Sequence, residues 1–187
     1  MSPRAWWVWA STAIWTFGRD LLTTVGGLSD TGSAVAWVFL GAVGTLGAAA
    51  GDVGHRFGLR KSWRLAMLLM ALGTALFAVF PHSSGIAWFG AAAFGLTYIE
   101  LTSLLLIWGT NVYPYSPASG VGIAFLVIAL GQAVGSPLMG MIAGAFDLRV
   151  AFLFASGIAV IGAFIKPVSA RRSRTRTDVP TQVRDIA

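Results

Sequence analysis

The sequence predicts an all-α integral membrane protein, a bundle of six transmembrane helices. The 187 residues are 56% hydrophobic and only 11% charged, with a mean hydropathy of +0.76, whereas about a quarter of the residues of a soluble domain are charged. No Asp, Glu, Lys or Arg residue lies between Arg64 and Glu100, or between Glu100 and Asp147. A helix crosses a bilayer with about 20 apolar residues, so each of these gaps has room for two spans.

Turn and breaker residues divide the apolar part of the chain into six helices. The predicted ranges are about 5–28, 33–51, 62–80, 86–111, 118–146 and 150–165. The first helix is interrupted at Arg19-Asp20 and ends at Gly26-Gly27, and the third stops before Pro81, which cannot continue a helix. The proline-bounded segment Tyr113-Pro114-Tyr115-Ser116-Pro117 separates the fourth helix from the fifth. Residues 1–167 are therefore predicted to form one transmembrane domain.

The basic residues predict the orientation of the bundle. Arg4, a cluster after the second helix and the tail after the sixth helix all fall on one side; the cluster consists of Arg56, Arg60, Lys61 and Arg64. By the positive-inside rule this side is cytoplasmic. We expect an integral protein of the plasma (inner) membrane with both termini in the cytoplasm, and a disordered basic cytoplasmic tail over residues 168–187.

Composition argues against several classes of function. The net charge of +6 does not predict nucleic-acid binding, because six of the thirteen basic residues lie at or beyond Lys166, in the tail that flanks the membrane. The chain has no cysteine and only two distant histidines, so neither a metal site nor a cofactor is predicted. An intramembrane enzyme is disfavoured because no serine–histidine or paired-carboxylate arrangement occurs at helical spacing.

The first three and the last three predicted helices share two features. Ionisable residues inside a span occur in the first helix, at Arg19-Asp20, and in the fourth, at Glu100. Glycines form a ridge along the second helix and along the fifth; these are Gly41, Gly44, Gly47 and Gly51, and Gly122, Gly131, Gly135, Gly140 and Gly144. Ordinary close packing explains most single GxxxG pairs, but matching features in matching helices are typical of transporters built from inverted triplets.

Two motifs resemble the major facilitator superfamily of transporters. Gly51-xxx-His55-Arg56-x-Gly58-x-Arg60-Lys61 follows the second helix, where the family has Gly-xxx-Asp-Arg-x-Gly-x-Arg-Arg/Lys. His55 stands at the family's acidic position, and Asp52 lies about one helical turn before it. The fifth helix contains Gly122-x8-Gly131-x3-Gly135-Ser136-Pro137-x2-Gly140, which is similar to the family's glycine-proline pattern but has one extra residue between Gly135 and Pro137.

The resemblance covers residues 5–166 and implies half a transporter, because the family normally has twelve helices. The loose motifs and the basic tail favour the carboxyl-terminal half of bacterial members, built from two inverted three-helix repeats. The resemblance implies alternating-access secondary transport of a small molecule, with a proton as one candidate for the coupled ion and Gly51 to Lys61 as a cytoplasmic gating loop. A second copy, a neighbouring half-length chain or the rest of a split gene would supply the other half. The alternative is a truncated, structural or regulatory membrane protein without transport of its own.

Charged side chains within the hydrocarbon region are candidates for function, because they are costly there unless they face a cavity or a partner. Arg19, Asp20 and Glu100 are such residues. The resemblance places the first and fourth helices along a central cavity, where Thr97, Tyr98 and Ser103 would also be accessible. A carboxylate there can exchange protons and an arginine can hold an anionic group of the substrate. Structural pairing, or snorkelling of Arg19 to the interface, is the alternative.

Three further expectations concern side chains inside the spans. Gln132 is a candidate for substrate contact, although between Gly131 and Gly135 it would more often link two helices. At about 1.5 Å per residue, Arg19 lies nearer the outer face and Glu100 nearer the inner face, so the sequence does not establish a direct bridge between them. Six tryptophans near span ends are expected to anchor in the membrane interface; these are Trp6, Trp7, Trp9, Trp37, Trp63 and Trp88.

Overall fold

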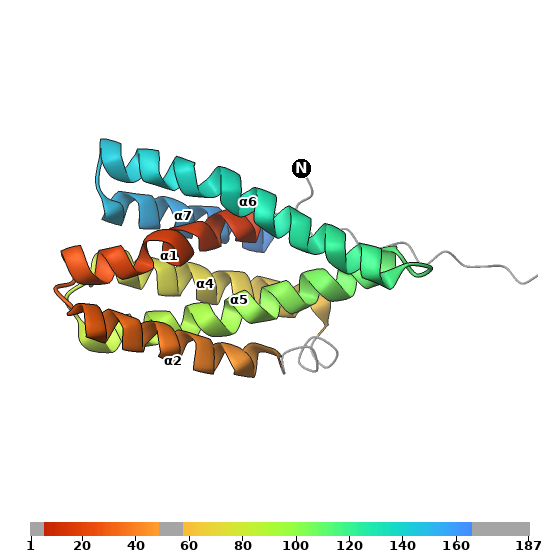
Figure 1. Ribbon diagram of the computed structural model, residues 1–187, viewed down its shortest axis with the longest axis horizontal. Helices are drawn as coiled ribbons and strands as arrows, with labels where there is room; N and C mark the ends of the chain where they lie inside the picture. Colours follow the sequence, from red (N-terminus) through yellow and green to blue (C-terminus); the bar gives the residue numbers. More distant parts are fainter. Residues whose placement is uncertain (1–5, 49–57, 166–187) are drawn as a thin grey trace, which may run out of the picture.

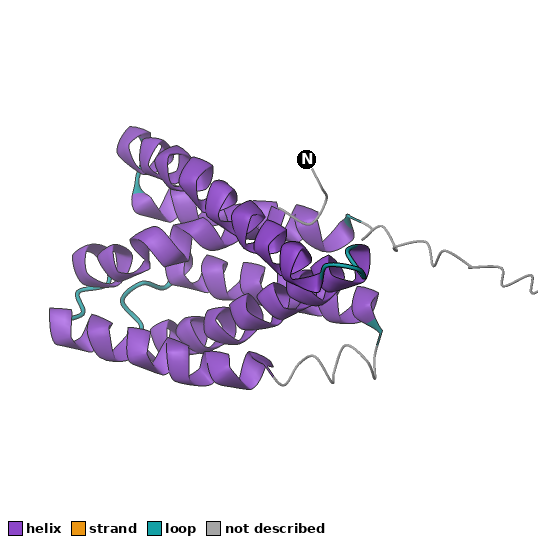
Figure 2. Ribbon diagram, turned by 45° about the vertical axis from the view of Figure 1, so that its right-hand side comes forward, coloured by secondary structure: helices purple, strands orange, loops and turns teal. Residues whose placement is uncertain are grey.

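The computed structural model of the protein describes residues 6–48 and 58–165. Its elements are α1 (Trp6–Asp20), the π-helical turn η1 (Leu21–Val25), α2 (Asp30–Ala48), α4 (Leu59–Val79), α5 (Ser84–Val112), α6 (Pro117–Ala145) and α7 (Leu148–Phe164) (Figure 1). Among these residues Figure 2 shows only helices and short loops, without a strand. The predicted tail at 168–187 and the loop residues Gly51, Asp52, His55 and Arg56 lie outside the described residues.

Four helices are long and apolar enough to cross a membrane: Asp30–Ala48, Arg60–Val79, Ser84–Val112 and Pro117–Ala145. α7 is apolar but has 17 residues, and α1 has 15 residues before η1 adds five more. Each described helix lies within a few residues of one of the six predicted ranges. These features support the prediction of an α-helical membrane protein.

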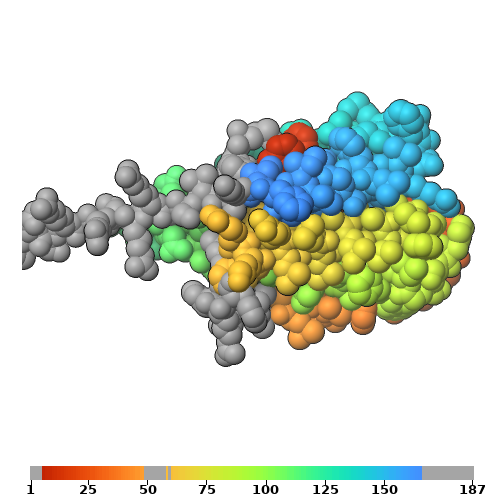
Figure 3. Space-filling view, turned by 180° about the vertical axis from the view of Figure 1, so that it is seen from behind, coloured from red at the N-terminus to blue at the C-terminus, as the bar shows by residue number. Residues whose placement is uncertain are grey.

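The helices form two layers. In Figure 1, α6, α1, α5 and α2 lie in the front layer, and Figure 3 shows α7 and α4 from the back. The packing contacts agree with this arrangement, because α4 packs against α5 and α7, α1 packs against α6 and α7, and α2 packs against α5. α1 therefore lies inside the front layer, between α6 and α5, with α7 behind it.

The back layer is held together by contacts between α4 and α7. The Ser156 hydroxyl donates a hydrogen bond to the Ala71 carbonyl oxygen at 2.8 Å, and the Trp63 indole nitrogen donates to the Gly162 carbonyl oxygen at 3.3 Å. The rings of Phe77 and Phe152 lie 6.4 Å apart between the same two helices. In lipid, helices are held together by hydrogen bonds and close packing rather than by hydrophobic burial. The contact between α4 and α7, which we call the α4–α7 seam, supplies both and joins the first three helices to the last three.

Glycines let α2 approach the backbone of α5 closely and make room on α6 for side chains of α1. Gly44 and Gly47 of α2 face α5, and a side chain at Gly95 of α5 would overlap the Leu40 carbonyl oxygen. On the other side of the bundle, a Cβ at Gly135 of α6 would lie 2.7 Å from the Thr12 hydroxyl oxygen of α1. Part of each predicted glycine ridge therefore lies in a helix contact, α2 with α5 and α6 with α1.

The other predicted packing residues of α6 differ in their surroundings. A Cβ at Gly131 would lie 2.6 Å from a Val8 methyl carbon of α1, and one at Gly140 would lie 3.4 Å from the Phe17 ring. Pro137 is exposed. Gly41, Gly122 and Gly144 have no neighbour within 4 Å of a built Cβ, so packing in the described chain does not require glycine at these three positions.

We predict that Gly95→Ala lowers the free energy of unfolding by about 1–3 kcal/mol, because the new methyl group meets a main-chain carbonyl that cannot rotate away. Gly41→Ala is the matched control, since its methyl group meets no neighbour and alanine is the better helix former. Equilibrium unfolding of both variants in detergent measures the difference. Equal stability of the two variants would contradict the α2–α5 contact.

Candidate functional site

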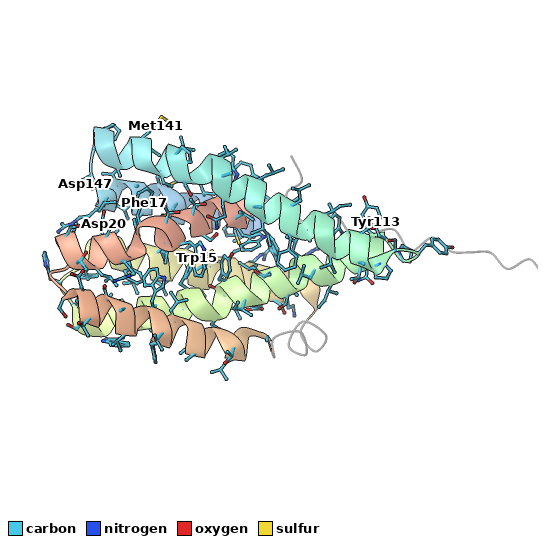
Figure 4. All side chains as sticks on the ribbon, viewed as in Figure 1. Trp15, Phe17, Asp20, Tyr113, Met141 and Asp147 are labelled. Carbon is cyan, nitrogen blue, oxygen red and sulfur yellow. The ribbon has the colours of Figure 1, made fainter. Side chains whose placement is uncertain are left out.

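An aromatic cluster lies between α1 and α5. The Trp15 and Tyr98 rings are stacked, with centroids 5.2 Å apart and an interplanar angle of 9°. Trp7 meets Tyr98 edge-on at 5.4 Å, and Phe94 lies 5.6 Å from Tyr98. Trp7 is fully buried, whereas 47% of Trp15 is exposed; Figure 4 places Trp15 in the gap between the two helix ribbons. Trp15 is thus the accessible member of a rigid aromatic stack.

The tryptophans correct one expectation from the sequence. Trp7 and Trp63 are only 0% and 5% exposed, so they are core residues rather than interface anchors. Both lie close to predicted helix ends, but their rings turn inward, Trp7 towards Tyr98 and Trp63 towards Gly162. Trp15, which the sequence did not single out, carries the exposed ring. The sequence feature that could have identified Trp15 as a site residue is its position one helical turn before Arg19.

Polar side chains connect α1 to α6. Gln132 donates a hydrogen bond from Nε2 to the Ser11 hydroxyl at 3.1 Å, and Ser11 itself donates to the Val8 carbonyl oxygen at 2.8 Å. One and a half turns further along α1, the Thr16 and Ser136 hydroxyls lie 3.0 Å apart. Gln132 is therefore an interhelical hydrogen bonder here, and it lies against the same helix as the aromatic stack.

Arg19 is held by α2. Its Nε and Nη2 atoms both lie 3.2 Å from the Ser33 hydroxyl oxygen, and that hydroxyl donates in turn to the Asp30 carbonyl oxygen at 2.9 Å. Ser33 is fully buried, while the arginine side chain is exposed. Ser33 is fixed by its own hydrogen bond, so it acts as a positioning residue for the guanidinium group.

The helix changes type immediately after Arg19 and Asp20. The π-helical turn η1 follows, and the Thr24 hydroxyl donates to the Asp20 carbonyl oxygen at 2.6 Å. The turn ends at Gly26 and Gly27, where Gly27 has a φ of 72°, a conformation that suits glycine. Single π-helical turns are frequent at functional sites. Here the turn follows the only two charged residues of α1, and the Asp20 side chain is exposed near this end of the bundle (Figure 4).

Thr97, Glu100 and Ser103 are not part of this cluster. Thr97 is fully buried and donates to the Ala93 carbonyl oxygen of its own helix at 2.7 Å, and Ser103 donates to Ile99 at 2.9 Å. Glu100 comes two residues after Tyr98, which places it on the opposite side of α5. Its side chain is half-buried and has no hydrogen-bonding or charged partner among the described residues. Tyr98 and Gln132 therefore both contact α1, the helix that carries Arg19, but at different residues, Trp15 and Ser11, and Thr97 and Glu100 lie elsewhere.

The described end of the predicted gating loop begins α4. Gly58 has a φ of 84°, and its carbonyl oxygen accepts a hydrogen bond from the Lys61 main-chain nitrogen at 3.0 Å. A positive φ of this size favours glycine, which explains the glycine at this position of the motif. Arg60 and Lys61 are exposed at the start of the helix.

We call the residues gathered at α1 the α1 site; they are Ser11, Trp15, Thr16 and Arg19 of α1, Tyr98 of α5, and Gln132 and Ser136 of α6. Within the part of the chain that the structure describes, no group of three His, Cys, Asp or Glu residues could hold a metal ion. The α1 site instead offers an aromatic face, a cation and several hydroxyl and amide groups. Such a set suits noncovalent binding of a small molecule.

Comparison with known proteins gave no match: no family model matches the chain, and neither a curated protein nor a solved structure does so. The interpretation of the α1 site therefore depends on its own geometry.

We predict that the Gln132–Ser11 hydrogen bond contributes about 0.6 kcal/mol to stability, the average for such bonds between membrane helices. Gln132→Leu and Ser11→Ala should each destabilise the bundle, and the double variant should lose less than the sum of the two. A double-mutant cycle by equilibrium unfolding measures the coupling. Strict additivity would show that the two side chains do not interact.

Proposed function

We propose that this chain is half of a secondary active transporter for a small molecule, similar to the major facilitator superfamily and working by alternating access. In this proposal all six helical segments span the plasma membrane, with α1 and η1 together forming the first span. The two triplets, α1–α2–α4 and α5–α6–α7, are inverted repeats. A second six-helix unit, either another copy or a complementary chain, completes the transporter.

The observation that carries the proposal is the correspondence between the contacts of the two triplets. If α1, α2 and α4 are exchanged with α5, α6 and α7, the α2–α5 contact becomes the α6–α1 contact, and α4–α5 becomes α7–α1. The α4–α7 seam maps onto itself, whereas the α5–α6 and α6–α7 contacts have much smaller counterparts in α1–α2 and α2–α4. The glycine ridges correspond as well, since Gly47 packs on α5 and Gly135 packs on α1. Inverted triplets of this kind are a common design of transporters.

A second argument is the chemistry of the α1 site. An exposed arginine is costly against lipid unless it faces water or a partner, and Arg19 lies in the front layer beside an exposed tryptophan. Covering this layer with another six-helix unit would enclose the α1 site in a central cavity. Asp20 and Glu100 are the carboxylates available for proton coupling, and the loop from Gly51 to Lys61 is the proposed cytoplasmic latch.

The alternative, a structural membrane protein that binds partners through its glycine ridges, fits the packing less well. The glycines that need close neighbours, including Gly47, Gly95 and Gly135, already meet other helices of the same chain. They are therefore not available to an external partner helix, whereas Gly41, Gly122 and Gly144 have no such neighbour and stay open to one.

We predict that proteoliposomes containing the full chain with its second half take up substrate, and that Arg19→Gln lowers the transport rate at least tenfold. The reason is loss of the cation in the cavity. Arg149→Gln is the matched control, because Arg149 is also exposed but lies at the start of α7. Glu100→Gln tests coupling, since it should abolish the dependence of uptake on a proton gradient if this carboxylate carries the proton. Unchanged transport and pH dependence in both the Arg19 and Glu100 variants would reject these roles.

We predict that the turn between α5 and α6 and the turn between α4 and α5 lie on opposite sides of the membrane. Tyr115 is fully exposed in the turn between α5 and α6, at the end of the bundle where α1 begins, and His82 is exposed in the turn between α4 and α5 at the other end. The chain has no cysteine, so Tyr115→Cys and His82→Cys each provide a single thiol. An impermeant thiol reagent should label the cysteine at position 115 only from the cytoplasm and that at position 82 only from outside; the reverse would overturn the orientation.

A further inference from the structure

We propose that the α1 site binds a planar aromatic carboxylate, with its ring stacked on Trp15 and its carboxylate held by Arg19. This inference builds on the proposed function, because it names the class of substrate that the transporter would carry. It depends on two neighbouring groups of α1, each of which is accessible and each of which has unused binding capacity.

The aromatic half of this subsite is Trp15. Its ring stacks on Tyr98 almost in parallel, yet 47% of the residue remains exposed. Tyr98 is in turn fixed by Trp7 and Phe94, so the exposed indole cannot easily turn away. A flat ring that stacks on it extends the existing stack, and such aromatic pairs gain energy beyond the area they bury. Saturated rings and open chains lack this gain.

The anionic half of the subsite is Arg19. A guanidinium group has five N–H donors, and the hydrogen bonds from Nε and Nη2 to Ser33 use two of them. No carboxylate of the described chain forms an ion pair with it, although Asp20 is its sequence neighbour. The remaining donors match the geometry of a carboxylate. Ser33 fixes the guanidinium group without neutralising it.

The spacing of the two residues matches one ligand. Trp15 and Arg19 are four residues apart in α1, so they lie on the same face about 6 Å apart along the axis. The proposed ligand spans this step of the helix, with its ring on Trp15, which stacks on α5, and its carboxyl group towards Arg19, which is held by α2.

The test is binding of benzoate to the purified full chain in detergent, measured by calorimetry. We expect benzoate to bind more tightly than benzamide, which lacks the charge, and than cyclohexanecarboxylate, which lacks the aromatic ring. Arg19→Gln should weaken benzoate binding roughly tenfold or more, the effect of losing a hydrogen bond to a charged group, and leave benzamide binding unchanged. Trp15→Leu should weaken benzoate and benzamide alike.

Matched controls distinguish the subsite from general effects of charge or aromatic residues. Arg149→Gln removes an exposed arginine at the start of α7, and Trp88→Leu removes a tryptophan that packs edge-on against Phe39. Both should leave benzoate binding unchanged. Because the comparison of the three ligands uses the unaltered chain, it remains decisive even if a variant fails to fold.

Two results would overturn the inference. The first is equal affinity of the unaltered chain for the three ligands, which includes the case that none of them binds. The second is an equal loss of benzoate binding in Arg149→Gln and Arg19→Gln. Its failure is distinguishable from failure of the proposed function. Uptake of another class of solute without benzoate binding would reject the ligand and keep the transporter. Benzoate binding without any uptake would keep the subsite and reject transport.

Discussion

Close approach of helix backbones at glycine is the constraint on which the rest of this structure depends. In lipid, apolar side chains gain little from leaving the solvent, so helices associate through tight packing and hydrogen bonds. At Gly131 and Gly135 the surface of α6 is flat enough to accept Val8 and Thr12 of α1. Gly95 does the same for α5 against the α2 backbone. These contacts set the positions of the four front helices.

The α1 site follows from that packing. Since α6 lies close to α1, Gln132 reaches Ser11 and Ser136 reaches Thr16. On its other side α1 presents Trp15 to Tyr98, and at its end Arg19 reaches Ser33 of α2. α1 thus collects polar or aromatic contacts from three different helices, while η1 ends its α-helical geometry just after the arginine. A change in how these helices pack would alter the site directly, as the proposed alternating-access cycle requires.

Much of the fold is readable from the sequence because its signals are local. Proline at 81, the Gly26-Gly27 pair and the long uncharged stretches predict the helices, and the glycine ridges predict where helices approach. The site is readable only in part. Tyr98 and Gln132 contact α1, the helix of Arg19, whereas the rotation of α5 turns Thr97 into the core and Glu100 to the far side of Tyr98. That rotation depends on the contacts of Gly95 and Leu40, which no local pattern encodes.

In the proposed transporter, α1 faces a water-accessible cavity rather than lipid. The most direct measurement is the reactivity of single cysteines with a water-soluble thiol reagent in the membrane, for which the cysteine-free chain is well suited. Thr16→Cys lies in the α1 site, and Leu153→Cys lies at an exposed position of α7. The two positions have a similar depth, because α1 and α7 touch at Trp6 and Gly162. Thr16 is ten residues from Trp6, and Leu153 is nine residues from Gly162. We predict rapid labelling at position 16 and none at position 153. Equal protection of both positions would contradict the account.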